Sequence, residues 1–287
     1  MAETKSGGVR RQDDLAKRPG ESDEQSAQRT AIARRLAHIR RKVIVLSGKG
    51  GVGKSTVAAN IAVAAAQAGV RTGLLDVDIH GPSIPRLLGL EGVRASAEGD
   101  HLLPVPAGEN LKVMSIGFLV GGRDQPIIWR GPMKFSMIRQ FLADVDWGEL
   151  DLLVIDCPPG TGDEPLSVVQ LIRDADGAIV VTTPQKLAVD DVRRAVTFCR
   201  ELSLPILGVI ENMSGFACPK CGEVSEVFGS GGGESMAADM QIPFIGRIPI
   251  DPRISASGDA GRPAVAEAGA VAGAEVFLRA AEIAAGR

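Results

Sequence analysis

Short apolar runs alternate along the chain with longer helix-like segments. The apolar runs have the length and composition of strands buried on both faces, and they cover residues 43–46, 72–75, 111–116, 152–155, 178–181, 206–210 and 244–248. The helix-like segments between them cover residues 55–68, 133–143, 165–173, 188–202 and 234–239. This alternation predicts an α/β fold in which helices cover both faces of a mostly parallel central sheet.

The first forty residues have a different composition. Residues 1–28 are rich in Gly, Ser and charged residues and contain almost no large apolar side chain, so they cannot offset the entropy lost on ordering. Residues 31–41 place Leu36 and Ile39 among arginines, which is compatible with a short amphipathic helix, although we favour a solvated basic lead-in. We therefore expect a disordered tail over residues 1–40 and one folded domain over residues 41–287.

The strongest local signal follows the first predicted strand. The pattern G-x-x-x-x-G-K-[ST] is matched by Gly48, Lys49, Gly50, Gly51, Val52, Gly53, Lys54 and Ser55, with Thr56 completing the predicted nucleotide-binding loop. Glycines let the backbone wrap around phosphates, and the following helix adds its positive N-terminal end. The pattern predicts that Lys54 reaches the β- and γ-phosphates of ATP and that Ser55 binds Mg²⁺. Residues 41–287 are therefore expected to be a P-loop ATPase domain.

Acidic residues follow two other predicted strands. Asp76 and Asp78 come at the end of one strand, and Asp156 ends a later strand just before Pro158-Pro159-Gly160. Because ligands of parallel sheets bind beyond the carboxyl ends of the strands, we expect these acids beside the phosphate loop. Asp156 fits the Walker B role of holding the Mg²⁺ shell, and Asp76 is assigned to the outer shell of the metal. A single such Asp can be a loop cap, but three that converge favour a nucleotide site.

Cys218 and Cys221 form a CxxC pair late in the chain. Two thiolates are about half of what a [4Fe–4S] cluster or a structural zinc needs. In a homodimer with twofold symmetry the same patch of each copy meets itself, so two such pairs would make one site of four cysteines. We favour an iron–sulfur cluster, with zinc second and a redox CxxC third, because the sequence lacks a thioredoxin-like setting.

Composition narrows the compartment and the partners. The formal net charge of −3 gives no overall basic field for nucleic acid or an anionic membrane. Four unevenly spaced cysteines are too few for a disulfide framework, which favours a reducing, cytoplasmic setting. The longest apolar runs stop short of the ~20 residues that span a bilayer. We therefore expect a cytoplasmic protein that binds neither nucleic acid nor membranes.

Several motifs together resemble one known family. The loop with two lysines, Lys49 and Lys54, is similar to the deviant Walker A loops of nitrogenase iron protein, MinD, ParA and the Mrp/ApbC-type cluster carriers. The chain resembles the Mrp/ApbC branch over about residues 42–253, through the runs 78–85 (DIHGPSIP), 129–133 (WRGPM), 156–163 (DCPPGTGD), 182–185 (TTPQ) and 211–222 (ENMSGFACPKCG). The resemblance implies a homodimer that hydrolyses ATP slowly, takes an iron–sulfur cluster from an assembly scaffold and passes it to apo-proteins.

The resemblance also implies roles for three residues. Lys49 would reach across the dimer interface to the nucleotide of the other copy and stabilise charge there, as an arginine finger does elsewhere. Asp78, at the switch I position, would orient the attacking water. Asn212 would read the adenine edge, to which an amide can both donate and accept. The expected catalytic residues are thus Lys49, Lys54 and Asp78, and the expected metal ligands are Cys218, Cys221 and Ser55.

An alternative of another class is a positioning ATPase similar to MinD or ParA. That use needs a cationic amphipathic C-terminal helix or a basic patch for DNA. Residues 269–287 are rich in Ala and carry only Arg279 and Arg287 as cations, beside Phe277 and Leu278. We expect a packing helix there, which makes this alternative weak.

Overall fold

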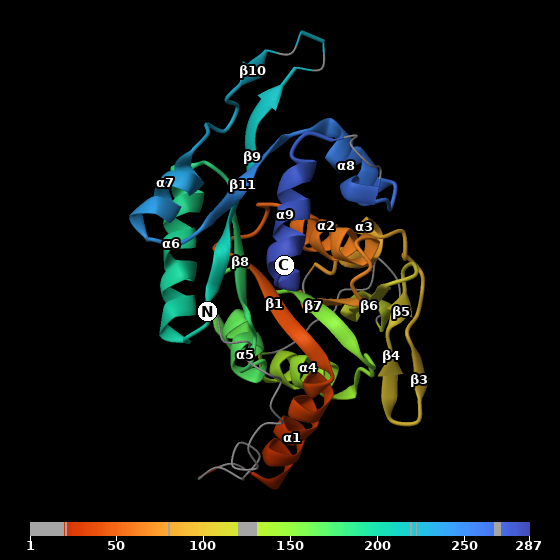
Figure 1. The fold of residues 1–287 in the computed structure, drawn as a ribbon. Coiled ribbons are helices and arrows are strands. Elements are labelled where there is room, and N and C mark those ends of the chain that lie inside the picture. Colours follow the sequence, from red (N-terminus) through yellow and green to blue (C-terminus); the bar gives the residue numbers. More distant parts are fainter. Residues whose placement is uncertain are drawn as a thin grey trace.

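The computed structural model describes residue 20 and residues 22–79, 81–119, 131–218, 220–221, 223–266 and 271–287 (Figure 1). The strands are β1 (Ile39–Ser47), β2 (Thr72–Asp76), β3 (Ser96–Glu98), β4 (His101–Leu103), β5 (Val105–Pro106), β6 (Leu111–Ser115), β7 (Leu150–Asp156), β8 (Gly177–Thr182), β9 (Ile206–Ala217), β10 (Val224–Ser225) and β11 (Phe244–Ile250). The helices are α1 (Asp23–Ala37), α2 (Lys54–Gln67), α3 (Ile84–Leu87), α4 (Gly131–Asp144), α5 (Asp163–Leu171), α6 (Lys186–Glu201), α7 (Gly232–Asp239), α8 (Pro252–Asp259) and α9 (Ala274–Ala285), with short 3-10 turns η2 (Ile116–Phe118) and η3 (Ala264–Ala266).

One large sheet forms the centre of the described chain. Its parallel strands lie in the order β11, β9, β8, β1, β7, β2 and β6, while β5 and β10 add antiparallel pairings at β6 and β9. β2 and β8 are buried along their whole length, as strands covered on both faces must be. The seven predicted strands are all present, and the predicted mostly parallel α/β fold is confirmed.

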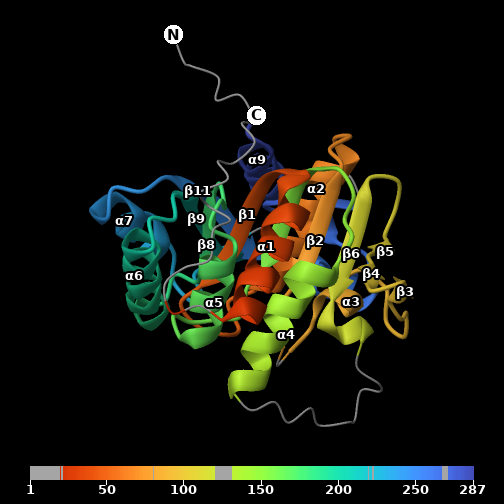
Figure 2. The ribbon, with the colours of Figure 1, turned by 90° about the horizontal axis from the view of Figure 1, so that it is seen from below.

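Helices cover both faces of this sheet, as Figures 1 and 2 show. α2 and α9 pack together on one face, where α9 buries Phe277 and three alanines. The opposite face carries α1, α4, α5 and α6, and α7 packs beside α6. The five predicted helices are present, and residues 274–285 form the expected packing helix. No helix in the described part of the chain combines the length and the hydropathy of a membrane span.

The expected disordered tail over residues 1–40 is wrong for its second half. α1 begins at Asp23, and the side chains of Ile32 and Leu36 are buried where α1 packs against α4. Ser22 and Gln25 form a reciprocal capping box, with both side chain to backbone bonds at 3.1 Å. This Ser-x-x-Gln spacing was the available signal for the start of the helix, and the arginine-rich composition masked it. Residues 1–19 and 21 lie outside the described residues.

β9 also differs from its prediction. The strand was expected to end at residue 210, yet it continues to Ala217 and projects beyond the sheet with β10 (Figure 1). Its register against β11 shifts between Asn212 and Phe216, where Met213 and Gly215 have positive φ angles of 57° and 76°. The strand is therefore irregular at the point where it leaves the sheet.

The packing of α1 predicts a measurable contribution to stability. Leu36→Ala should lower the free energy of unfolding by about 2–4 kcal/mol, because it removes buried apolar atoms and leaves a cavity. Leu278→Ala in α9 is the matched control, since that leucine is 49% exposed and its loss should change stability by less than about 0.5 kcal/mol. Urea unfolding measures both. Equal stability of Leu36→Ala and the wild type would show that α1 does not belong to the folded domain.

Candidate nucleotide and cluster sites

Register places three polar side chains in a row across adjacent strands. Ser115 of β6 pairs with Asp76 of β2, and Asp76 pairs with Asp156 of β7. Asp156 in turn pairs with Val45 of β1, the strand that leads into the predicted phosphate loop. The parallel sheet thus brings the loop and two of the three predicted acids to one edge, as the sequence led us to expect.

The loop between β1 and α2 requires glycine at particular positions. Gly51 and Gly53 have φ angles of 79° and 84°, which side chains rarely tolerate. A Cβ on Gly48 would lie 2.4 Å from the backbone of Asp191 in α6. α2 begins at Lys54, so the positive end of a helix of 14 residues faces the loop. These features fit a binding site for phosphates.

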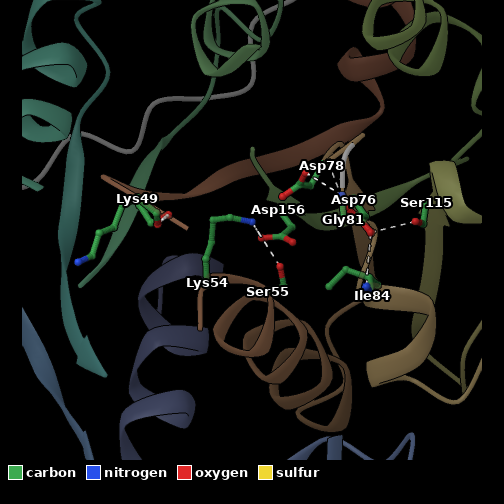
Figure 3. Close-up of polar contacts among 10 residues, drawn as sticks. Lys49, Lys54, Ser55, Asp76, Asp78, Gly81, Ile84, Ser115 and Asp156 are labelled. Carbon is green, nitrogen blue, oxygen red and sulfur yellow. Dashed lines mark hydrogen bonds and ion pairs between the residues drawn. The ribbon is translucent and has the colours of Figure 1, made fainter. Parts of the chain in front are cut away.

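Lys54 is buried and paired. Its Nζ donates to Asp156 Oδ1 at 2.6 Å and to Ser55 Oγ at 3.3 Å (Figure 3). Burial alone would lower the pKa of Lys54, but the charge of Asp156 and the hydrogen bond that it accepts raise it. The complete burial of Asp156 raises the pKa of that carboxyl group, although the charge of Lys54 and its hydrogen bond act to lower it. The ammonium group is therefore charged and held beside the phosphate loop.

The second oxygen of Asp156 has a chemistry that fits Mg²⁺. Asp156 Oδ2 is buried and has no hydrogen-bond partner within the described residues. A buried carboxylate oxygen without a partner is costly, and a cation removes that cost. Mg²⁺ prefers oxygen ligands. The hydroxyl of Ser55 and the carboxyl group of Asp156 both lie beside the ammonium group of Lys54 (Figure 3). Asp156 and Ser55 can therefore hold a magnesium ion, which would supply positive charge to the phosphates of a bound nucleotide.

Asp76 and Asp78 belong to the same cluster. Asp76 is fully buried, and burial together with the charge of Asp156 raises its pKa to about 8. Asp76 Oδ1 accepts a hydrogen bond from the backbone N–H of Asp78 at 3.1 Å. Asp78 is half-buried, and its Oδ1 accepts from the N–H of Gly81 at 3.3 Å. Asp78 thus keeps some exposed surface, whereas Asp76 is enclosed.

Lys49 and Asn212 occupy different sides of the loop. The side chain of Lys49 points away from Lys54 and Asp156 in Figure 3. The side chain of Asn212 lies on the loop itself, where Nδ2 donates to the carbonyl of Val52 at 2.9 Å. A Cβ on Gly53 would lie only 2.2 Å from that nitrogen. The structure therefore brings Asn212 to the nucleotide site and directs Lys49 away from the acids of its own chain.

The CxxC pair lies at the end of the hairpin formed by β9 and β10 (Figure 1). The backbone N–H of Cys218 donates to the carbonyl of Glu223 at 2.9 Å and closes the turn. Cys221 is exposed and Cys218 is half-buried. Hydrogen bonds from the backbone at Cys221 and Lys220 lower the pKa of Cys218, which favours its thiolate. Pro219 and Gly222 lie outside the described residues.

Within the part of the chain that the structure describes, the hairpin cysteines are the only thiols that are not buried in the core. Within the described residues no group of three or more His, Cys, Asp or Glu side chains is arranged to hold a metal ion. The two other cysteines are buried in the core, and burial raises the pKa of Cys157 well above its usual value and that of Cys199 to about 12. Any site with four cysteine ligands at the hairpin would need ligands from a second molecule.

Two polar residues of these sites were not predicted from the sequence. Ser115 donates to Asp76 Oδ2 at 2.9 Å, but a single serine at the end of a strand has no distinguishing pattern. Glu211 is fully buried and accepts hydrogen bonds from Ser214 Oγ at 2.5 Å and from the N–H groups of Gly231 and Gly233 at 2.8 and 2.5 Å. A charged residue in a strand buried on both faces was a usable signal for Glu211. It fastens the base of the hairpin to the start of α7. His80 and Trp129, quoted in the family motifs, lie outside the described residues.

The buried carboxyl of Asp76 predicts how stability depends on pH. Its pKa is 3.8 in the unfolded chain and about 8 in the folded protein, so between these values the folded state keeps a proton that the unfolded chain has released. Stability should therefore fall as pH rises through this window, by up to about 1.4 kcal/mol per pH unit. Asp76→Asn removes the titration. Urea unfolding in EDTA without nucleotide should show the variant gaining stability relative to the wild type between about pH 5 and about pH 8; a constant difference would contradict this.

Comparison with known proteins identifies the family to which the chain belongs. Residues 38–284 match the ParA family model described as NUBPL iron-transfer P-loop NTPase. A cytosolic Fe-S cluster assembly factor NUBP2 homolog from Culex quinquefasciatus is 52% identical over 236 residues, which are 81% of this chain and 92% of that protein. An iron-sulfur cluster carrier protein from Methanocaldococcus jannaschii is 49% identical over 238 residues, which are 83% of this chain and 82% of that protein.

Solved structures agree with this match. A nucleotide-binding protein in complex with ADP from Archaeoglobus fulgidus has a TM-score of 0.72 and 44% identity, and the match covers 82% of this chain and 91% of that one. MinD complexed with Mg-ADP from Pyrococcus horikoshii has a TM-score of 0.62 and 25% identity, over 84% of this chain and 94% of that one. Since the family model spans most of the chain and the two relatives are identical to it at about half of the aligned residues, the chain belongs to the NUBPL iron-transfer family of P-loop NTPases.

Proposed function

We propose that the protein is an ATP-hydrolysing carrier that binds a [4Fe–4S] cluster between two copies of itself and transfers it to apo-proteins. The observation that carries the proposal is the projecting hairpin, which presents Cys218 and Cys221 away from the nucleotide loop of the same chain. The names of the relatives, an iron-sulfur cluster carrier and a cytosolic assembly factor, support the same cargo and a cytoplasmic location. The other partners would be a cluster assembly scaffold and the apo-proteins, without nucleic acid or membrane.

The nucleotide half of the function follows from the loop and its acids. Lys54 would exchange its bond to Asp156 for the β- and γ-phosphates of ATP, and the glycine-rich loop from Gly48 to Thr56 would enclose them. Ser55 and Asp156 would hold Mg²⁺, and Asp78 would orient the attacking water. Asn212 already bonds the loop through one amide hydrogen, which leaves its oxygen and second hydrogen for the adenine edge.

Lys49 would act on the nucleotide that is bound by the other copy in a dimer. Its side chain points away from the acids of its own site, so a role in the same site would require it to turn around (Figure 3). In a face-to-face dimer the same side chain can reach the phosphates bound by the partner. It would there stabilise the charge that develops during phosphoryl transfer.

Binding of the cluster would depend on the twofold symmetry of the same dimer. Two hairpins would supply four thiolates, the number that a [4Fe–4S] cluster requires, and neither chain could hold the cluster alone. The lowered pKa of Cys218 favours the ligand form of its thiol. Because the hairpin is exposed, thiolates of an apo-protein can replace those of the carrier one at a time, with no change in oxidation state. Zinc at the same cysteines is the rival, and the metal content of anaerobically purified protein separates the two.

A positioning role similar to that of MinD is less well supported. The MinD structure shares 25% identity with this chain, against 49–52% for the relatives named for iron–sulfur cluster work. The likeness to MinD therefore supports the fold, while the cysteine pair on the hairpin favours the carrier function.

Substitution of the two loop lysines tests the nucleotide half. Lys54→Ala should abolish ATP hydrolysis and weaken nucleotide binding, since it removes the cation beside the phosphates. Lys49→Ala should lower kcat by about 100-fold or more while the Kd for ATP changes by only a few-fold, because its target is the nucleotide of the other copy. Steady-state hydrolysis and fluorescent-nucleotide titration measure both. Equal loss of binding in the two variants would place Lys49 in its own site.

Anaerobic reconstitution with iron and sulfide tests the cargo half. The wild type should hold about four iron atoms per dimer, and Cys218→Ser or Cys221→Ser should strip the iron while ATP binding survives. Cys199→Ser is the matched control and should leave both properties unchanged, because Cys199 is buried in the core. Iron analysis, visible absorption and mass in solution are read together. A full cluster on a monomer, or one retained when both hairpin cysteines are serine, would refute the bridging site.

A further inference from the structure

The carboxyl group of Asp76 holds both ends of the connection from β2 to α3. Its Oδ1 accepts a hydrogen bond from the N–H of Asp78, and its Oδ2 accepts one from the N–H of Ile84 at 3.4 Å (Figure 3). Asp78 lies at the start of this connection and Ile84 is the first residue of α3. Both oxygens of Asp76 are thus engaged inside the protein, and together they fix the backbone that carries Asp78.

Ser115 gives Asp76 its third hydrogen bond. The hydroxyl of Ser115 donates to Asp76 Oδ2 at 2.9 Å and accepts from the N–H of Gly117 at 3.1 Å. A hydroxyl has one proton, and the bond from Gly117 occupies a lone pair and leaves that proton directed at Asp76. Neither Ser115 nor Asp76 has exposed surface, so water cannot replace a lost bond.

Packing joins the same two segments a second time. The turn η2 follows Ser115 and lies against the connection from β2 to α3. A Cβ on Gly117 would be 3.1 Å from Pro85 Cγ and 3.5 Å from Pro82 Cβ, so the two segments are in close contact. Ser115 and Gly117 therefore hold the connection and the start of α3 in two ways, through the hydrogen bond to Asp76 and through close packing at Gly117.

We propose that Ser115 is a positioning residue for ATP hydrolysis, which acts through Asp76 to set the place of Asp78. Ser115 itself lies on β6, two strands away from Asp156, and is separated from the phosphate loop by Asp76. The proposal rests on the ATPase half of the proposed function. It also changes the role expected for Asp76, from the outer shell of the metal to the anchor of the connection that carries Asp78.

The first arm of the test measures the anchor without turnover. In Ser115→Ala, hydrogen exchange of backbone amides in the peptide covering residues 77–84 should become about tenfold faster in protein without nucleotide, because the carboxyl group that holds this backbone has lost a donor. Thr72→Val is the matched control. It removes a buried hydroxyl from the other end of β2, where Thr72 donates to the carbonyl of Val70, and should leave this peptide unchanged. Equal exchange in Ser115→Ala and the wild type would overturn the proposal, whatever the rates of hydrolysis.

The second arm separates turnover from binding. Ser115→Ala should lower kcat by about tenfold and change the Kd for ATP by less than about twofold, and Ser115→Thr, which keeps the hydroxyl, should recover most of the rate. The double variant Asp78→Asn, Ser115→Ala should be no slower than Asp78→Asn alone, because both changes affect one step. Additive losses, equal losses of kcat and affinity, or an unchanged kcat would each refute the role.

The outcomes for the two proposals are distinguishable. A wild type that hydrolyses ATP but takes up no cluster would refute the carrier role alone, and the exchange and rate data would still decide the role of Ser115. A wild type that takes up a cluster but does not hydrolyse ATP would refute the ATPase half and the role of Ser115 together.

Discussion

The buried ion pair between Lys54 and Asp156 is the contact on which the nucleotide site depends. It joins the loop after β1 to the end of β7, and both side chains are almost completely removed from water. A buried charge without a partner is strongly destabilising, so each of these groups needs the other or a ligand that replaces it. Phosphate can replace the carboxylate on Lys54, and Mg²⁺ can replace the ammonium on Asp156. The same pair therefore stabilises the loop and defines what can bind there.

The hairpin differs from the nucleotide site in that its functional side chains are accessible rather than buried. Cys221 is exposed and Cys218 is half-buried, so ligands at the hairpin can be reached from outside the protein. Glu211 fastens the base of the hairpin through three hydrogen bonds, while its tip carries the exposed Cys221. A rigid base with an accessible tip is suited to exchange between proteins, where geometry must be kept and access must be open.

One strand connects these two regions. Asn212 of β9 bonds the phosphate loop, and Cys218 follows six residues later, directly after the end of that strand. Between them lie the shift in register against β11 and the positive φ of Met213, an unusual conformation for a long side chain. The fold shared with MinD supplies the sheet and the loop, whereas the extension of β9 is where this chain presents its cysteines.

The sequence by itself determined the strands, the main helices and the phosphate loop, because these depend on local patterns. Apolar runs of strand length that are bounded by turns can be identified directly in the sequence. The glycines from Gly48 to Gly53 indicate a tight loop, and two of them, Gly51 and Gly53, have φ angles that other residues rarely adopt. It also gave Asp156 and the CxxC pair, since strand ends and fixed spacings are visible along the chain. Even α1 had a local signal in its capping box, which composition concealed.

Only the tertiary structure decided which of these residues meet. The pairing of Ser115 with Asp76 depends on β2 and β6 being neighbours, and residues 39 positions apart carry no mark of that contact. The burial of Glu211 depends on α7, which the chain reaches twenty residues later. The continuation of β9 past residue 210 depends on its pairing with β11 and β10, which no local preference encodes. Local patterns fix which elements form, whereas the contacts between distant side chains are fixed by how those elements pack.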